Sequence, residues 1–501
     1  MSETPAVESA FWEYERALMA NDLEALDRLF APGPETLRGD AAGILVGHDA
    51  ISGFRRGRGG APKREIAHVE VRMLSADAAL VIAITVPATG GRGQQTQLWR
   101  LTDGAWRVSA AHVALPAPAV NASVWRTVGT PLVRGVSAGV LSGQTVAVKD
   151  LYDVEGFAVG AGIPAWLESA HPADGTSPAV AALLAAGADV TGIAQTDEFA
   201  YSIAGRNPHY GTPPNPAVLG GVPGGSSSGP ASAVALGQAS IGLGTDTAGS
   251  IRVPASYQGL WGLRSTHGSV SSDRLLPLAP TFDTVGWLTR SATVLRAAAE
   301  ATLDTTLQRE AGGFVVAPAL LEFCEPDVRA AFQPYLSHEA VDLGDIDELF
   351  VAFRTVQQSE AWAVHGPWIE AHPGALGDDI AARFALAAAV TAEQAAEARD
   401  AMAAAKERLD GILGDRVLLL PAASSTAPSV LADADLIERT RQGTLRLTCV
   451  AGLTGRPGLS APLLTVPQPG ALLGAPVGLG LVGPRYSDLA LIDAAERLRA
   501  G

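Results

Sequence analysis

The sequence predicts two folded units: a small α+β cone, followed by a larger α/β unit whose mixed central sheet is covered by helices. The chain has 501 residues, which is too long for one compact core of ordinary size. In its first part, helical apolar spacing gives way to strand-like runs without helices between them. After the proline-alanine stretch at residues 116–121, apolar strands alternate with helices, which is typical of a sheet covered on both faces.

The first unit is expected at residues 1–116. Apolar side chains recur at helical spacing from Val7 to Phe30, and Asp22 can cap a second helix within this stretch. Asp103-Gly104 is a strong hairpin signal, so we expect a curled antiparallel sheet. The expected elements are an extended stretch at 35–46, a helix at 49–56, and strands at 66–74, 79–86, 95–101 and 106–115.

A linker at 117–128 and a second unit at 129–501 are expected to follow. Helical periodicity and apolar runs define the elements of this unit, and Ser291 is a plausible N-cap for one of its helices. The expected strands lie at 143–150, 190–193, 417–421 and 475–482, and the expected helices at 177–188, 196–201, 230–237, 291–307, 381–413 and 487–499.

The composition argues against several classes of partner. A net charge of −16 disfavours a general affinity for nucleic acid or anionic membrane, because a polyanion would be repelled. No uncharged apolar run is long enough to span a membrane, and the first residues lack the apolar segment of an export signal. Cys324 and Cys449 are the only cysteines, and they are interpreted as buried thiols. We therefore expect a cytoplasmic protein with no nucleic-acid or membrane partner.

Residues 222–254 contain two glycine-rich loops joined by a short helix. The first loop carries three serines beginning at Ser226, and the second ends at Ser250, 24 residues later (250 minus 226). Backbone N–H groups in such loops bind phosphate or stabilise an oxyanion during acyl transfer. The Lys-Ser/Thr ending of a phosphate-binding loop is missing, and no G-x-S-x-G motif surrounds Ser250. The stretch therefore favours acyl transfer, with both loops facing one site.

Acyl transfer also needs a base, and Lys149 is the candidate. It ends an apolar strand, where desolvation disfavours the ammonium and leaves a neutral amine that can accept a proton. Taken alone, the segment VAVKD also fits a structural lysine that pairs with Asp150. The serine loops favour the catalytic interpretation, because Thr247, Ala248 and Gly249 can present successive N–H groups to an oxyanion.

These residues resemble the amidase signature family over about residues 129–491. The match is densest where GGSSSGPASAVALG is followed by LGTDTAGSIRVPASYQGLWGLRSTHG. The resemblance implies an amidase-signature α/β fold and a hydrolase of linear amides. It also implies a Ser-Ser-Lys triad that forms an acyl-enzyme, with Ser250 as nucleophile, Ser226 as a bridging serine after a cis peptide bond, and Lys149 as base. The further residues that it implies are Thr247, Ala248, Gly249 and Ser250 for the oxyanion hole, and Ser227, Asp246 and Arg252 in support.

Two parts of the motif depart from the family pattern. Ala248 stands where glycine is usual, and it would narrow or reorient the oxyanion turn if this position needed a positive φ. Ser228 and Pro230 alter the first loop. Within the family, the segments DEFAYSIAGRNPHYGTPPNP, GAGIPAW and TFDTVGW are most similar to the branch of plant indole-3-acetamide hydrolases. That similarity implies a small primary amide, such as an aromatic one, as substrate.

The first unit resembles the AtzH-like branch of the nuclear-transport-factor-2-like fold, on the stretches VGHDAISGFR and GRGQQTQLWR. It departs after Arg38, where small residues and Asp40 replace an aromatic position. Tyr14, Arg38 and Arg92 either line a carboxylate-binding pocket or are a core tyrosine and solvated arginines. AtzH-like domains accompany amidases of carboxylated urea compounds, which are the alternative substrate class. We expect this unit to promote homo-oligomerisation or to cover the active site.

We expect no cofactor and no metal site. The nine histidines lack the paired spacing of zinc ligands. Trp362, His365 and Trp368 recur on one helical face, although Pro367 would bend or end that helix. Core packing is the favoured interpretation of these three side chains, and lining of a substrate pocket is the alternative.

Three function classes remain open. The leading one is an amidase whose partner is a small-molecule amide. A non-catalytic amidase-like docking protein is disfavoured, because Lys149, Ser226 and Ser250 are all present. The glutaminase subunit of an amidotransferase is disfavoured by the extra first unit.

Overall fold

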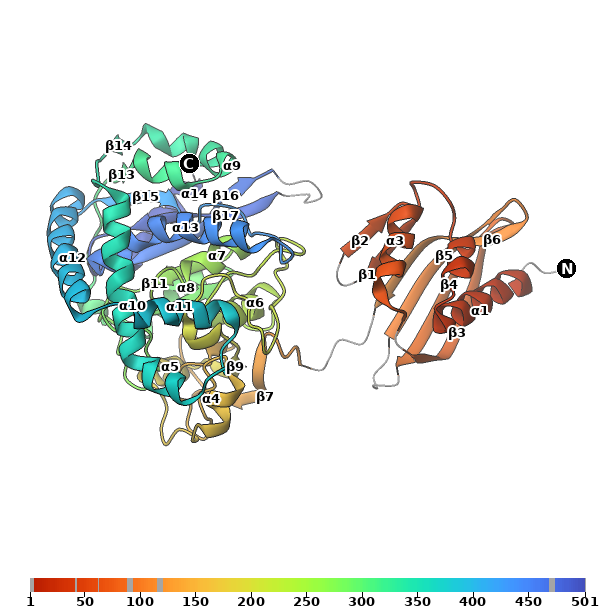
Figure 1. The fold of residues 1–501 in the computed structure, drawn as a ribbon, viewed down its shortest axis with the longest axis horizontal. Helices are drawn as coiled ribbons and strands as arrows, with labels where there is room; N and C mark the ends of the chain where they lie inside the picture. Colours follow the sequence, from red (N-terminus) through yellow and green to blue (C-terminus); the bar gives the residue numbers. More distant parts are fainter. Residues whose placement is uncertain are drawn as a thin grey trace. The chain divides into compact units, whose positions relative to one another are not determined.

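The computed structural model divides the chain into two compact units, Met1–Ala119 and Val120–Gly501 (Figure 1). The second unit begins before the predicted residue 129, because β7 (Trp125–Val133) joins its sheet. The predicted linker therefore reaches too far into this unit, and its residues 117–119 lie outside the described part of the chain. The structure describes residues 4–40, 43–61, 63–87, 93–114, 120–467 and 474–500.

The first unit packs helices against a sheet with the strand order β2-β1-β6-β5-β4-β3 in its described residues. The neighbouring strands are antiparallel except β1 and β6, so the prediction of a wholly antiparallel sheet is wrong at that pair. A parallel bridge between Phe30 and Val108 already aligns the chain with β6 before β1 begins. The elements are α1 (Thr4–Ala20), α2 (Leu23–Leu29), α3 (His48–Arg58), β1 (Leu37–Asp40), β2 (Gly43–Val46), β3 (Arg64–Ser75), β4 (Ala78–Pro87), β5 (Gly93–Thr102) and β6 (Ala105–Ala114).

The helix cap and the hairpin turn predicted in the first unit are both present. The Asp22 side chain accepts a hydrogen bond from Ala25 N at 3.0 Å and so caps α2. Asp103 and Gly104, with φ of 51° and 75°, close the hairpin between β5 and β6.

Tyr14 and Arg38 both lie inside the first unit. Tyr14 is buried beside Trp99, as in the core interpretation. Arg38 is only 8% exposed and lies 2.7 Å from Asp40, so it is not a solvated arginine. Arg92 lies outside the described residues.

The second unit is built on a mixed sheet, as predicted. Its described strands have the order β14-β13-β15-β17-β16-β11-β12-β10-β8-β9-β7. In addition to β7, the strands are β8 (Thr145–Lys149), β9 (Asp189–Ala194), β10 (Ile241–Asp246), β11 (Trp261–Arg264), β12 (Thr284–Thr289), β13 (Phe314–Val316), β14 (Glu339–Ala340), β15 (Val417–Pro421), β16 (Gly458–Val466) and β17 (Ala475–Val482).

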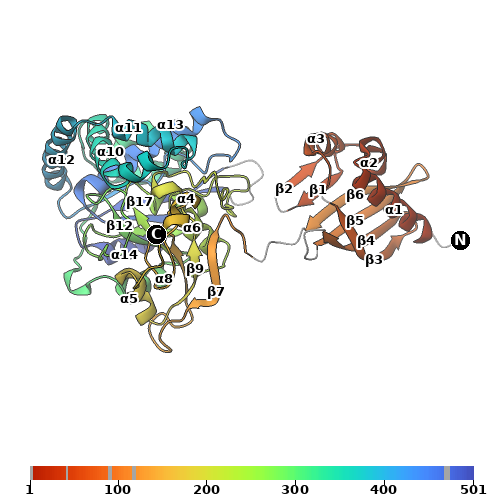
Figure 2. The same cartoon turned by 60° about the horizontal axis from the view of Figure 1, so that its bottom comes forward.

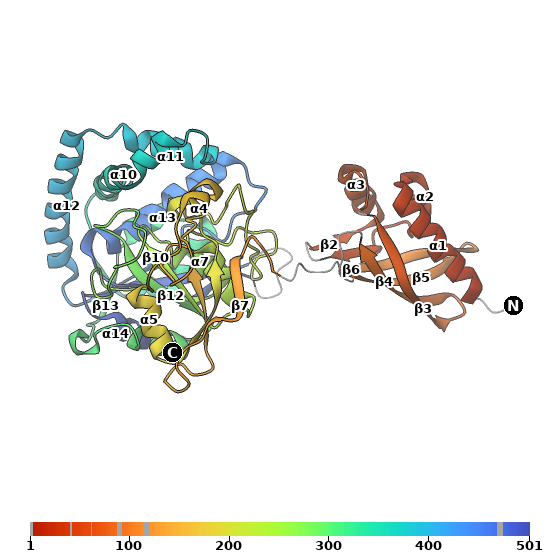
Figure 3. The same cartoon turned by 90° about the horizontal axis from the view of Figure 1, so that it is seen from below.

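Helices cover both sides of this sheet. Figures 2 and 3 show α10, α11 and α12 gathered on one side, whereas α8 and α14 lie on the other side in Figure 2. The helices are α4 (Pro164–Ser169), α5 (Pro178–Ala185), α6 (Ser228–Ala235), α7 (Arg252–Gln258), α8 (Ala292–Glu300), α9 (Pro326–Phe332), α10 (Ile346–Ala371), α11 (Asp378–Ala388), α12 (Ala392–Leu413), α13 (Ala434–Thr454) and α14 (Asp488–Ala500). Short 3₁₀ turns lie at Glu198–Ala200, Thr305–Leu307, Pro318–Phe323 and Gln333–Ser337.

Several predicted helices differ from the structure. The helix expected at 381–413 is two helices, because Thr391 caps α12 through a reciprocal hydrogen-bonded box with Gln394. The helix expected at 196–201 is a single 3₁₀ turn, in which Phe199 has a φ of 46° that no α-helix accommodates. The helix predicted at 291–307 ends at Glu300, where α8 ends.

Candidate active site

Parallel strands β8 and β10 place the predicted residues at one edge of the sheet. The two strands are neighbours, and they end at Lys149 and Asp246. The carboxyl ends of neighbouring parallel strands lie together, and such edges commonly hold the sites of α/β folds. Ser226 lies just before α6, and Ser250 lies in the loop between β10 and α7.

A continuous series of polar contacts joins the three predicted catalytic residues. Lys149 Nζ lies 2.9 Å from Ser226 Oγ, and Ser226 Oγ lies 3.0 Å from Ser250 Oγ. Lys149 Nζ also lies 2.8 Å from Thr245 Oγ1. All these side chains are buried. The geometry therefore allows protons to pass between the amine and both hydroxyl groups.

The surroundings of Lys149 favour a neutral amine. Burial lowers the pKa of Lys149 to about 7, although the carboxylates of Asp197, Asp283 and Asp246 act in the opposite direction. The alternative pairing of Lys149 with Asp150 is absent. Instead, Asp150 Oδ2 lies 2.8 Å from Arg126 Nε.

The loop that carries Ser226 is fixed by its neighbours on both sides. The peptide bond between Gly225 and Ser226 is cis. The Ser226 carbonyl accepts a hydrogen bond from Thr196 Oγ1 at 2.9 Å. Ser227 Oγ donates to the Thr245 carbonyl, and Ser228 Oγ donates to Asp197 Oδ1 at 3.0 Å.

Asp246 organises the loop that carries Ser250. Its carboxylate accepts from Arg252 Nη2 at 2.8 Å and Nε at 3.0 Å, and from Arg264 Nη1 at 3.2 Å. It also accepts from the N–H of Gly249 at 2.8 Å and of Ile251 at 3.2 Å. Burial raises the pKa of the Asp246 carboxyl, but the adjacent Arg252 and Arg264 outweigh this and hold it well below its usual range. The carboxylate thus remains charged and holds the turn around Ser250.

These contacts correct one part of the predicted oxyanion hole. The N–H of Gly249 is committed to Asp246 and is not directed at a substrate. The N–H groups of Thr247, Ala248 and Ser250 have no hydrogen-bond acceptor in the part of the chain that the structure describes. Three of the four predicted donors thus remain available to an oxyanion.

Ala248 fits the turn without backbone strain. Its φ is not positive, whereas Gly249 takes the φ of 122° that the turn requires. The Ala248 carbonyl accepts from Thr448 Oγ1 at 2.7 Å. The presence of alanine in place of glycine therefore leaves the predicted geometry of the loop intact.

A narrow recess opens beside Ser250, with about 20 Å³ of room for the centres of water-sized molecules. Thr247 and Ala248 form one part of its wall together with Ser250. The 3₁₀ turn and the loop after it supply Ala200–Ile203, and helices supply Gln357, Arg383, Arg441 and Leu445. The recess places small and polar groups next to the Ser250 hydroxyl.

The predicted aromatic face on α10 is core. His365 is 1% exposed, stacks on Phe199 and has its Nε2 2.9 Å from the Pro277 carbonyl. Burial lowers the pKa of His365 to about 4. Trp368 packs against Trp166, and α10 does not end at Pro367 but continues to Ala371. None of the three predicted side chains is part of the recess wall beside Ser250.

Sequence reasoning missed several polar side chains of the site. Thr245 contacts Lys149 Nζ, and the carboxylates of Asp197 and Asp283 act on its charge. Arg264 donates a hydrogen bond to Asp246, as Arg252 does. Each lies within or near a segment that carries the family resemblance, so buried polar residues in those segments were an available signal. Arg383 and Arg441 lie on distant helices and had no such signal.

The rest of the described chain adds no metal cluster. Over residues 4–500, less the gaps given above, no group of three or more His, Cys, Asp or Glu side chains is arranged to hold a metal ion. Within the same ranges, each helix is too short or too polar to cross a membrane.

The chain is similar to known amidases over most of its length. A family model described as Amidase matches residues 127–312, and one described as AtzH-like matches residues 3–118. Amidase 1 of Arabidopsis thaliana is 33% identical over 413 residues, which cover 74% of this chain and 96% of that protein. The 1-carboxybiuret hydrolase subunit AtzE of Pseudomonas sp. (strain ADP) is 42% identical over 168 residues, which cover 34% of this chain and 36% of that protein.

The solved structures lead to the same family. One described as a crystal structure of amidase has a TM-score of 0.65 and 30% identity, covering 72% of this chain and 85% of that chain. The Amidase model matches residues 127–312, which include both serine loops. The chain therefore belongs to the amidase signature family of amide hydrolases, and an AtzH-like unit precedes its amidase unit.

Proposed function

We propose that the protein hydrolyses the C–N bond of a small amide through a Ser-Ser-Lys triad and an acyl-enzyme. The observation that supports this most directly is the unbroken series from Lys149 Nζ to Ser226 Oγ, 2.9 Å, and from Ser226 Oγ to Ser250 Oγ, 3.0 Å. The recess beside Ser250 marks the side from which an amide carbon would approach this hydroxyl.

In the first half-reaction, Ser250 Oγ attacks the amide carbon and gives its proton to Ser226, whose own proton passes to neutral Lys149. The N–H groups of Thr247, Ala248 and Ser250 stabilise the oxyanion. When the C–N bond breaks, the proton returns from Lys149 through Ser226 to the leaving nitrogen, and the acyl group stays on Ser250.

In the second half-reaction, water takes the place of the leaving amine. It attacks the ester carbon and delivers its proton through Ser226 to Lys149. The C–O bond to Ser250 breaks, the proton returns to Ser250, and the carboxylic acid leaves. Asp246 and Arg252 keep the nucleophile's turn in place, and Ser227 ties the first loop to β10.

Variants of the triad test this proposal. Ser250→Ala and Lys149→Ala should each lower kcat at least about 10³-fold without unfolding the protein, as measured by release of ammonia or amine and by circular dichroism. Asp493→Asn, at an exposed ion pair, is the control. Full activity in either triad variant would overturn the assignment.

A carboxylated urea compound is the second candidate substrate. Its support is the similarity to a protein named 1-carboxybiuret hydrolase subunit, together with the AtzH-like unit. A hydrolysis screen of primary amides, anilides, carbamates and carboxylated ureas separates these classes by kcat/KM.

We also propose that the first unit mediates homo-oligomerisation in the cytoplasm. β2 is one of the two edge strands of the described sheet, and it carries Ile44 and Val46 with 72% and 60% of their surfaces exposed. An edge strand with exposed apolar side chains favours pairing with a second copy of the chain. Cys324 and Cys449 are free thiols, which agrees with a reducing compartment.

A further inference from the structure

The recess beside Ser250 has a cationic wall that the triad does not use. Arg383 on α11 and Arg441 on α13 line the same space as Ser250. Among the described residues, no aspartate or glutamate lines it. The recess therefore presents two positive charges and no negative charge to a substrate.

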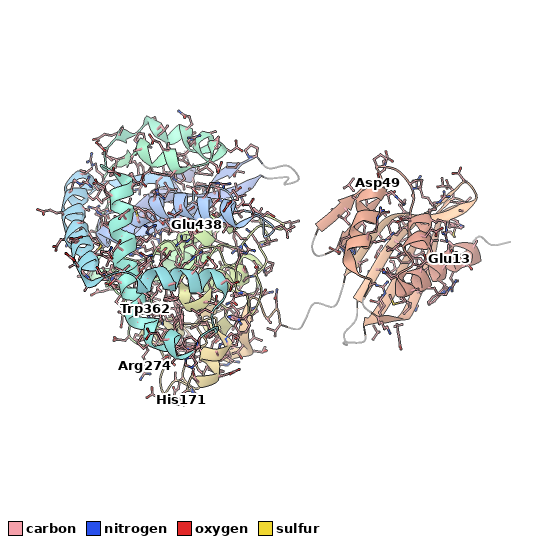
Figure 4. All side chains as sticks on the ribbon, viewed as in Figure 1. Glu13, Asp49, His171, Arg274, Trp362 and Glu438 are labelled. Carbon is pink, nitrogen blue, oxygen red and sulfur yellow. The ribbon has the colours of Figure 1, made fainter. Side chains whose placement is uncertain are left out.

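The carboxylates that pair with these two guanidinium groups lie outside the recess. Asp379 contacts Arg383 at 2.8 Å with 69% of its side chain exposed, and Glu438 contacts Arg441 at 3.0 Å with 49% exposed. Glu438 is labelled on α13 in Figure 4. Asp379 binds Arg383 through both carboxylate oxygens, whereas Arg441 makes a single contact with the half-exposed Glu438, which compensates little for the burial of its guanidinium group.

The two arginines also repel each other. Burial lowers the pKa of Arg441 to about 10, and the charge of neighbouring Arg383 acts in the same direction. An anion that entered the recess would relieve both effects, because it would bring a negative charge to the buried cations.

Arg441 has free donors for such an anion. Arg383 is committed, since its Nη1 donates to the Tyr201 carbonyl at 2.9 Å and its Nε and Nη2 donate to Asp379. Arg441 uses Nη1 for Glu438, and its Nε and Nη2 have no acceptor among the residues described. The buried Gln357 lies on the same wall, and its side-chain amide can donate a hydrogen bond. A planar fork of N–H groups matches the two oxygens of a carboxylate.

We propose that the substrate is a half-amide, whose acyl part carries a carboxylate that Arg441 binds, with Gln357 as a second donor and Arg383 as a nearby positive charge. This inference rests on the proposed function, because it places the amide carbon at Ser250. The small recess favours a short acyl chain between the two groups. A free α-amino acid amide is a poor substrate, because its ammonium would face two guanidinium groups and no carboxylate.

The test compares succinamate, a four-carbon half-amide, with butyramide, the neutral amide of equal length. The wild type should hydrolyse succinamate with a kcat/KM about 10- to 100-fold higher. Arg441→Gln should lose this preference, measured as the ratio of kcat/KM for the two amides, by raising KM for succinamate, and Arg441→Lys should retain part of it. Arg439→Gln, two residues away on the exposed side of α13, should keep the preference.

A binding measurement separates this inference from the proposed catalytic function. By titration calorimetry, succinate should bind Ser250→Ala, and the double variant Ser250→Ala/Arg441→Gln should bind it about 10-fold or more weakly. Equal binding to both variants, or a wild type that prefers butyramide, would overturn the carboxylate site while leaving the triad untouched. Failure of Ser250→Ala to reduce turnover of either amide would overturn the triad, whatever the binding result.

Discussion

Lys149 is the residue whose protonation state controls the proposed chemistry. It is fully buried, and burial lowers its pKa to about 7. Only the neutral amine accepts a proton, so kcat/KM should rise with pH through about 7 and level off above it. The measurement is kcat/KM between about pH 5.5 and 9. A profile that stays flat across this range would contradict the role of Lys149 as base.

The sequence predicted those catalytic residues that lie in a recognisable local pattern. Ser226 and Ser250 are 24 residues apart (250 minus 226), and the upstream apolar strand marks Lys149. The partner of Asp150 was not predictable, since Arg126 lies in a different strand. Arg441 was not predictable either, because only the fold brings α13 to the Ser250 loop.

The hydrogen bond from the Gly249 N–H to Asp246 could not be predicted from the sequence. A glycine in a tight turn indicates an exposed N–H, but it does not reveal which acceptor that N–H will face. Asp246, three residues earlier, takes this N–H and leaves those of Thr247, Ala248 and Ser250 for the oxyanion.

The loop between β10 and α7 depends on one buried carboxylate. The Asp246 carboxylate joins both elements by accepting hydrogen bonds from Arg252, Arg264 and three backbone N–H groups. Asp246→Asn should lower the free energy of unfolding by about 3–5 kcal/mol, because it leaves two buried guanidinium groups without their counter-ion. Urea denaturation measures this change, and kcat should fall with it because the Ser250 turn loosens.

The matched control for this element is Asp493→Asn. Asp493 pairs with Arg296 while half exposed, so its loss should change the unfolding free energy by less than about 0.5 kcal/mol. A similar decrease in unfolding free energy for Asp246→Asn and Asp493→Asn would show that the hydrogen bonds of Asp246 do not hold the loop.

Element types were predictable from periodicity, whereas element ends depended on details of capping and packing. The alanine-rich pattern at 381–413 has helical spacing throughout, and Thr391 divides it by capping α12. In α10, the buried contacts of His365 and Trp368 hold a helix that Pro367 alone predicts to bend or end.

The two units have separate hydrophobic cores, which is the main feature at the scale of the whole molecule. The sequence predicted this division, because helices precede the strands in the first part of the chain, whereas strands alternate with helices in the rest. The parallel pairing of β1 with β6 was not predictable, because short strands carry no signal of their direction.

The proposed role of the first unit predicts a change in mass. The double variant Ile44→Lys/Val46→Lys should convert an oligomer to a monomer, because it places charges on the exposed edge strand β2. Light scattering coupled to size-exclusion chromatography measures this. Leu431→Lys, at a residue 90% exposed in the second unit, should leave the mass unchanged. If deletion of residues 1–119 altered neither the number of subunits nor kcat/KM, the first unit would neither assemble the protein nor cover its active site.

Covalent labelling of Ser250 tests the central claim most directly. Phenylmethylsulfonyl fluoride should modify the protein once, at Ser250, as located by peptide mass spectrometry, because the Lys149–Ser226 series activates this hydroxyl. The labelling rate should rise with pH through about 7 and fall sharply in Lys149→Ala. Labelling at another serine, or an equal rate in Lys149→Ala, would contradict a Ser-Ser-Lys site.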